Sequence, residues 1–154
     1  MKRILIVGAG GQIGSELTTY LRKIYGNDNV IATDVRDCRQ LAESGPFEVM
    51  NALDANAMAE MVSRQKIDSI FNLVALLSAV GEAKPQTAWQ INIGALMNSL
   101  EVARQYNCAL FTPSSIGAFG PSSPKDKTPQ DTVMRPTTMY GVCKVTGEML
   151  GDYY

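Results

Sequence analysis

The chain opens with the stretch RILIVGAGGQIGSEL, residues 3–17. Its apolar part, Ile4–Val7, predicts a buried β-strand. The glycines at positions 8, 11 and 14 predict a tight turn that leads into a helix. Strand, glycine turn and helix in this order form a cradle for a diphosphate, because free N–H groups at a helix start face the anion. The alternative is a glycine-rich turn that binds nothing. The amides expected to face the phosphates are those of Gly11, Gln12 and Ile13.

The composition is typical of a globular protein. Of the 154 residues, 45% are hydrophobic and 19% are charged, with a formal net charge of −1. A chain of this length can bury roughly 70% of its unfolded surface, which is enough for one independent core. The balanced charge argues against disorder and against a nucleic-acid partner. Because no long apolar run is present, we expect neither a signal peptide nor a membrane span.

Cysteine and histidine usage narrows the chemistry. The three cysteines, Cys38, Cys108 and Cys143, are an odd number without paired spacing, which favours a reducing compartment and a cytoplasmic protein. Histidine is absent, which excludes Ser-His-Asp and Cys-His nucleophile systems within this chain. A zinc site that contains histidine is excluded as well, and we predict no metal.

Apolar runs alternate with amphipathic stretches along the chain. Strands are predicted at Ile4–Val7, Val30–Thr33, Phe47–Met50, Ser69–Val74 and Ala109–Thr112. Helices are predicted at Ile13–Tyr25, Ala55–Gln65, Thr87–Tyr106 and Thr138–Tyr153. This alternation predicts an α/β fold, a Rossmann-type doubly wound parallel sheet with helices on both faces. Residues 1–154 are interpreted as a single nucleotide-binding domain.

Three segments are predicted to be loops. Arg36–Gly45 is weakly periodic, with a short helix as the alternative, whereas Leu76–Pro85 and Ser114–Pro136 follow strand ends, where open α/β sheets bind ligands. Ser114–Pro136 contains four prolines and is interpreted as a lid or substrate loop. In the strand order 3-2-1-4-5-6 the fifth strand would be an exposed edge, so we expect that C-terminal strands and a substrate region are missing.

Asp34 ends the second predicted strand, 20 residues after Gly14. A carboxylate at this place accepts hydrogen bonds from the adenosine ribose, and its charge repels the 2′-phosphate of NADP. The predicted cofactor is therefore NAD, although Arg36 and Arg39 lie close enough in sequence to weaken the discrimination. The alternative for Asp34 is a surface aspartate or a helix cap.

A second chemical signal, Tyr140-Gly-Val-Cys-Lys144, lies near the other end of the chain. The spacing of four places both side chains on one face of a helix. An ammonium held within about 4–6 Å of a phenol favours the phenolate, so Tyr140 is predicted to be a general base assisted by Lys144. Ser115 is predicted to hydrogen-bond a substrate oxygen. The alternatives are an ordinary exposed helix face and, for Ser115, a turn cap.

Together these motifs resemble the extended short-chain dehydrogenases/reductases over nearly the whole chain. The residues that carry the resemblance are Gly8-x-x-Gly11-x-x-Gly14, Asp34, Asp54, Leu73-Val74-Ala75, Asn92, Ser115 and Tyr140-x-x-x-Lys144. The resemblance implies that Tyr140 is the catalytic base, that Lys144 binds the nicotinamide ribose and that Ser115 positions the substrate. It also implies cofactor contacts for three further segments: Leu53 and Asp54 at the adenine, Leu73 to Ala75 along the cofactor, and Asn92, which supports the central helix.

Within that family, three stretches are similar to short-chain L-threonine 3-dehydrogenases: Leu76–Ala79, Thr112–Pro121 and Pro136–Gly141. This implies NAD-dependent oxidation of the L-threonine hydroxyl to 2-amino-3-oxobutanoate. Ser78 would contact the substrate, with a loop cap as the alternative. Asn72 stands where many relatives have histidine and Ser115 where some have threonine. Sugar-nucleotide epimerases and dehydratases use the same motifs, and a non-catalytic NAD-binding module is a third alternative.

Such enzymes have a second half that supplies further strands and most substrate contacts. We therefore expect a longer enzyme of about 310–330 residues, that is, roughly another 150 residues or one typical domain. Turnover by the 154-residue chain alone is doubtful. The resemblance also implies a homodimer, formed by the helices at 87–106 and 138–153. The apolar side chains considered for that interface, with packing onto the sheet as the alternative, are Met97, Leu100, Met149 and Leu150.

Overall fold

The computed structural model describes residues 2–154, which form two compact units. The first, here called the sheet unit, comprises the chain up to Val74 together with Gly94–Pro113. The second, here called the helical unit, comprises Ala75–Ile93 and Ser114–Tyr154. The long helix α5 (Pro85–Tyr106) runs through both units.

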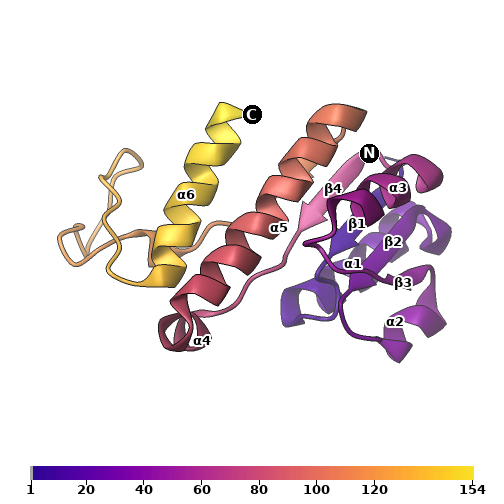
Figure 1. Ribbon diagram of the computed structural model, residues 1–154, viewed down its shortest axis with the longest axis horizontal. Coiled ribbons are helices and arrows are strands. Elements are labelled where there is room, and N and C mark those ends of the chain that lie inside the picture. Colours follow the sequence, from indigo (N-terminus) through magenta and orange to yellow (C-terminus); the bar gives the residue numbers. More distant parts are fainter. Residues whose placement is uncertain (1) are drawn as a thin grey trace. The chain divides into compact units, whose positions relative to one another are not determined.

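Five parallel strands form the sheet, in the order β3-β2-β1-β4-β5. Figure 1 labels four of them, β1 to β4. Central strand β1 pairs with β2 on one side, Ile4 opposite Val30, and with β4 on the other, Ile4 opposite Ser69. This order confirms the predicted Rossmann-type topology, with β5 as an edge. The strand bounds are β1 Ile4–Val7, β2 Val30–Asp34, β3 Phe47–Val49, β4 Ser69–Asn72 and β5 Ala109–Phe111.

Alternate residues of β1 enter two different cores, because successive side chains of a strand point to opposite faces. Leu5 and Val7 join one core, whereas Ile4 and Ile6 join the other. The first core includes side chains of α3 (Ala55–Gln65) and α5, and the second includes side chains of α1 (Gln12–Tyr25) and α2 (Arg39–Ser44). Helices therefore cover both faces of the sheet, as a doubly wound fold requires.

The observed helices agree with the predicted ones, with one correction. The remaining helices are α4 (Ser78–Ala83), α6 (Met139–Tyr153) and the 3-10 turns η1 (Asn27–Asn29) and η2 (Ile116–Ala118). The prediction that Leu76–Pro85 is a loop was wrong, because it contains α4, whose six residues are too few to show a helical period. The short helix considered within Arg36–Gly45 is present as α2. No helix in residues 2–154 is long and apolar enough to cross a membrane.

Strand β4 is shorter than predicted because its C-terminal residue turns the chain. The side-chain oxygen of Asn72 accepts the N–H of Val74 at 3.3 Å, which bends the backbone two residues after the strand. Leu73 still donates its N–H to the carbonyl of Val7 at 2.9 Å. The segment after β4 therefore stays beside the end of β1 and leaves the sheet at Val74.

A buried arginine on α1 connects this helix to β2, to α2 and to the segment before β3. Arg22 is 3% exposed, and its guanidinium donates to carbonyl oxygens at Val30, Leu41 and Pro46 and to the hydroxyl of Ser44. Burial lowers the pKa of Arg22 from its usual range. These contacts tie together α1, β2, α2 and the segment before β3 without using a carboxylate.

Arg22→Met is expected to lower the free energy of unfolding by about 3 kcal/mol, because several buried carbonyls lose their donors. Urea denaturation followed by circular dichroism measures this. The matched control is Lys23→Met, which removes an exposed cation from the next position of α1. Equal stability of the two variants would show that the Arg22 contacts contribute nothing net.

Candidate active site

The glycine turn after β1 packs closely against the strand ends at Gly8. Gly8 has φ +85°, and a Cβ there would lie 3.1 Å from the backbone of Leu73 and Val74. The N–H groups of Gly8 and Ala9 both donate to the carbonyl of Thr33 at 2.9 Å. The turn therefore crosses directly over the ends of β2 and β4, where only glycine fits at position 8.

Gly14 and Gly11 differ in the space around them. A Cβ on Gly14 would collide with the carbonyl oxygen of Gly8 and would lie 2.7 Å from the Cα of Ala9, so α1 starts directly against the turn. A Cβ on Gly11 would meet only the Gly8 oxygen at 3.5 Å, an ordinary contact. The fold leaves open space at Gly11, which fits a ligand that approaches the backbone there.

The first turn of α1 presents free donors at the same place. Among residues 2–154, the backbone N–H groups of Gln12, Ile13 and Gly14 have no acceptor. The predicted role of the Gly11 amide was wrong in one respect, since this N–H donates to the Gly8 carbonyl at 3.3 Å within the turn. Three unpaired amides beside an open glycine backbone fit a diphosphate group, because the helix N-terminus also carries positive partial charge.

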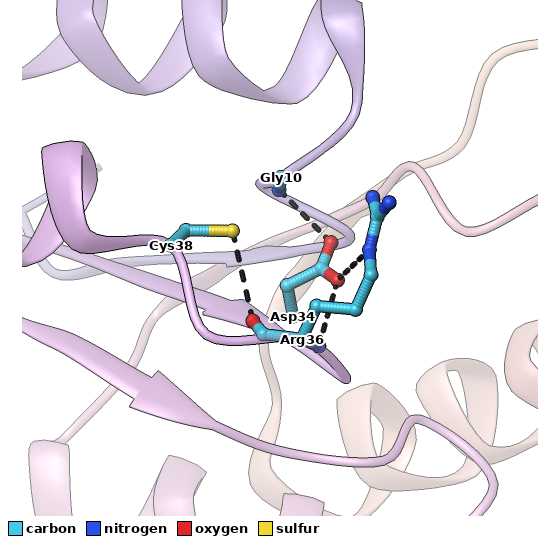
Figure 2. Close-up of polar contacts among 4 residues, drawn as sticks. All are labelled: Gly10, Asp34, Arg36 and Cys38. Carbon is cyan, nitrogen blue, oxygen red and sulfur yellow. Dashed lines mark hydrogen bonds and ion pairs between the residues drawn. The ribbon is translucent and has the colours of Figure 1, made fainter.

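Asp34 lies at the base of this turn, as Figure 2 shows. Its side chain is 8% exposed, and one carboxylate oxygen accepts the N–H of Gly10 at 2.9 Å. The other oxygen accepts the backbone N–H of Arg36 at 3.1 Å and lies 3.5 Å from that residue's Nε. Asp34 thus holds the glycine turn itself. The oxygen that accepts the Gly10 N–H retains acceptor capacity for a further donor such as a ribose hydroxyl.

The thiol of Cys38 completes the surroundings of Asp34. Its Sγ donates to the carbonyl of Arg36 at 3.6 Å (Figure 2), and a Cβ on Gly10 would lie 2.5 Å from this sulfur. Burial, together with the Asp34 carboxylate, raises the pKa of the Cys38 thiol. The sulfur therefore acts as a protonated packing group that excludes a side chain from position 10.

The helical unit brings the predicted catalytic side chains together on α6. Thr138 caps this helix, its hydroxyl accepting the Gly141 N–H at 3.1 Å. Tyr140 and Lys144 follow one turn apart, with the lysine Nζ 5.5 Å from the centre of the tyrosine ring. Burial lowers the pKa of Lys144. The predicted pair therefore shares one face of α6, with the ammonium over the aromatic ring.

Ser115 and Tyr140 both lie close to Gly117. The Ser115 hydroxyl oxygen caps η2 by accepting the Gly117 N–H at 3.1 Å. A Cβ on Gly117 would lie 3.2 Å from the Tyr140 ring and 3.5 Å from the Ser115 oxygen. The turn-cap alternative for Ser115 is thus present in the structure. It leaves the serine O–H free to donate to another oxygen.

Asn92 has both ends of its amide engaged with the backbone of Leu76. Its Oδ1 accepts the Leu76 N–H at 2.7 Å, and its Nδ2 donates to the Leu76 carbonyl at 3.1 Å. The side chain is buried on α5, so it fastens the segment that leads from β4 to α4. Ser78 is the first residue of α4 and is exposed; it makes no capping bond there, which does not favour the loop-cap alternative.

The residues predicted to meet the adenine have local roles in the fold. Asp54 is the N-cap of α3, and its carboxylate accepts the Ala57 N–H at 3.0 Å. Leu53 is 43% exposed and donates its N–H to the side chain of Asn51. Contacts of Leu53, Asp54 and Ala75 with a cofactor stay predictions. In residues 2–154 no three His, Cys, Asp or Glu side chains are grouped to hold a metal.

Sequence reasoning missed one contact on the helix that carries Tyr140. The carboxylate of Glu82, on α4, accepts the backbone N–H of Met139 at 2.7 Å. The two residues are 57 positions apart, and α4 itself was not predicted. No local pattern could have indicated this contact.

Known proteins resemble the whole chain but are twice as long. An uncharacterised epimerase/dehydratase of Staphylococcus saprophyticus is 54% identical over 156 residues, which cover 100% of this chain and 49% of that protein. L-threonine dehydrogenase from Clostridium difficile matches with a TM-score of 0.97 and 54% identity, over 100% of this chain and 49% of that one. UDP-glucose 4-epimerase from Thermotoga maritima matches with a TM-score of 0.87 and 25% identity, over 98% and 50%. The chain spans about half the length of the curated relatives it matches.

The sequence pattern of one family extends over almost all of the chain. The pattern of the NAD dependent epimerase/dehydratase family matches residues 4–154. This range includes the glycine turn, Asp34 and the Tyr140 and Lys144 pair. The match confirms the predicted resemblance and NAD as the cofactor. The chain therefore belongs to the NAD dependent epimerase/dehydratase family, among the extended short-chain dehydrogenases/reductases.

Proposed function

We propose that the intact protein oxidises the hydroxyl of L-threonine to give 2-amino-3-oxobutanoate. The observation that carries this proposal is the 54% identity to the L-threonine dehydrogenase from Clostridium difficile, compared with 25% to the UDP-glucose 4-epimerase. When bound, NAD+ supplies the hydride acceptor. The whole reaction is proposed for the intact gene product, because this chain spans only half of its relatives.

The sheet unit would hold the cofactor through its backbone. The unpaired N–H groups of Gln12, Ile13 and Gly14 would donate to the diphosphate, and the open space at Gly11 allows its approach. Asp34 would accept hydrogen bonds from the adenosine ribose with its remaining lone pairs. By family resemblance, Leu73 and the two residues after it would line the cofactor.

The helical unit would supply the residues that remove the hydroxyl proton of the substrate. Tyr140 would remove the hydroxyl proton of the substrate, with the Lys144 ammonium 5.5 Å from the centre of its ring. Ser115 already accepts a hydrogen bond from Gly117, so its own O–H would donate to the reacting oxygen. By family resemblance, Lys144 would also contact the nicotinamide ribose and Ser78 the substrate.

Product analysis of the intact gene product tests the proposal. With NAD+ and L-threonine we expect one NADH formed for each threonine consumed, and with a UDP-sugar no net reduction. Interconversion of UDP-sugars without NADH formation from threonine would instead support the epimerase alternative, which the names of the curated relatives favour. Cofactor binding without any turnover would support a non-catalytic module.

Asp34→Asn is expected to raise the affinity for NADP about tenfold, because one negative charge is removed beside the 2′-phosphate while an acceptor for the Gly10 N–H is kept. Calorimetric titration with NAD+ and NADP+ measures the ratio of the two affinities. The matched control is Asp37→Asn, which removes an exposed charge three residues away. An unchanged NAD+ to NADP+ ratio in the Asp34 variant would remove this residue from the ribose site.

We further propose that the intact protein is a cytoplasmic homodimer. Helix α6 supports this, because Met149 and Tyr153 lie one turn apart and are 67% and 82% exposed. Leu100, which was considered for the interface, is 6% exposed and packs into the core instead. Light scattering of the intact protein would detect the dimer.

A further inference from the structure

Two adjacent residues of α4 contact the first turn of α6. The Glu82 carboxylate accepts the Met139 N–H at 2.7 Å. Gly81, the residue before it, is buried, and a Cβ there would lie 3.9 Å from the backbone nitrogen of Tyr140. Helix α4 thus lies against the backbone nitrogens of Met139 and Tyr140.

The Glu82 contact supplies a second acceptor at the start of α6. The first N–H groups of a helix have no partner within the helix and need acceptors from elsewhere. Thr138 accepts the N–H of Gly141, whereas Glu82 accepts that of Met139. The Glu82 carboxylate is also favourably placed for the positive end of the helix dipole. The backbone that carries Tyr140 is therefore held from its own N-cap and from α4.

We propose that Glu82 is a positioning residue for Tyr140. By accepting the Met139 N–H, it sets the orientation of the first turn of α6, and with it the phenol, relative to α4. This inference rests on the proposed function, in which Tyr140 takes a proton from the substrate. Ser78, the predicted substrate contact, starts α4 four residues before Glu82, so the same bond links the substrate side to the base.

Loss of the Glu82–Met139 hydrogen bond should lower the rate of catalysis more than it lowers the stability of the fold. Glu82 lies on the surface, and exposed charged contacts of this kind contribute little to global stability. Proton transfer, in contrast, requires the base within hydrogen-bond distance of the hydroxyl, and small displacements of a reacting group lower the rate strongly. Loss of the bond would thus reduce turnover in a protein that is still folded.

Steady-state kinetics of the intact protein with L-threonine and NAD+ test the proposal. We expect Glu82→Ala to lower kcat about tenfold with an unchanged KM for NAD+. Glu82→Gln keeps an oxygen that can accept the Met139 N–H, so its kcat should stay within about threefold of wild type. The matched control is Glu60→Ala, which removes an exposed glutamate from α3.

Two results would overturn the proposal: a kcat within twofold of wild type in Glu82→Ala, or equal losses in Glu82→Ala and Glu82→Gln. Hydrogen exchange tests the Glu82 contact independently of the proposed function, because the measurement requires no substrate. The Met139 amide should exchange about tenfold faster in Glu82→Ala than in wild type. Faster exchange in a protein that does not oxidise threonine would refute the proposed function and leave the Glu82 contact standing. Unchanged exchange would refute the contact.

Discussion

Replacing Tyr140 by phenylalanine in the intact protein is expected to lower NADH formation from L-threonine by about 10³-fold, within the range that general acid–base catalysis contributes. Phenylalanine keeps the aromatic ring beside Gly117 and under the Lys144 ammonium and removes only the hydroxyl. Packing of α6 against η2 should therefore survive. The variant loses the group that takes the substrate proton and little else.

Stopped-flow or steady-state absorbance of NADH measures the rate, and calorimetry measures NAD+ binding. The affinity for NAD+ should stay within about threefold of wild type, because the diphosphate donors lie on α1. Tyr20→Phe is the matched control, since it removes a hydroxyl from a tyrosine that is 61% exposed on α1. Wild-type turnover in Tyr140→Phe would end the assignment of Tyr140 as the base.

The second large effect is expected at the glycine turn. Gly14→Ala places a methyl group 2.7 Å from the Cα of Ala9 and closer still to the Gly8 carbonyl, so α1 must move away from the turn. We expect the free energy of unfolding to fall by about 1–3 kcal/mol, as for other overpacked sites. NAD+ affinity should fall at least about tenfold, because the displaced amides no longer converge on the diphosphate.

Gly11→Ala separates ligand binding from folding. Its methyl group would meet only the Gly8 oxygen at 3.5 Å, and φ of −77° suits any residue. Stability should therefore change by less than about 1 kcal/mol, the usual cost at an N-cap. NAD+ affinity should still fall about tenfold, because the methyl group occupies the space that the diphosphate needs. Calorimetry and urea denaturation of the two variants give both quantities.

Normal NAD+ binding by Gly11→Ala would contradict the proposal that the glycine turn binds the diphosphate of NAD+. In that case the open space at position 11 would have no ligand, and the glycine there would have no explanation in the fold. An equal loss of stability in both variants would also contradict it, because the two glycines would then serve packing alone.

The elements of the fold could be predicted because their signals are local. Ile4–Val7 and Ala55–Gln65 have the bounds that their apolar patterns indicate. The strand order follows from strands that alternate with helices and from the right-handed crossover. Helix α4 was not predicted, because its six residues do not complete two helical turns and so show no helical period in the sequence.

The candidate site residues could be named from motifs, but their bonds could not. Nothing in the motif shows that the Gly11 amide closes the turn, or that Asp34 holds the N–H of Gly10 at 2.9 Å. Arg22 occupies a helical position that suits an exposed cation equally well. Its burial depends on carbonyls from three segments that meet only in the folded chain.

The sequence by itself thus determined the order of the strands and the longer helices, the glycine turn, the cofactor class and the spacing of Tyr140 and Lys144, because periodicity and helical spacing act over a few residues. Only the tertiary structure decided which amides are free, what Asp34 and Ser115 already bind, and that Glu82 reaches Met139. The physical reason is that each of these contacts is fixed by the packing of backbone segments against one another. Such hydrogen bonds form only when the donor–acceptor distance is right to within a few tenths of an ångström. The order of residues along the chain does not specify distances that finely.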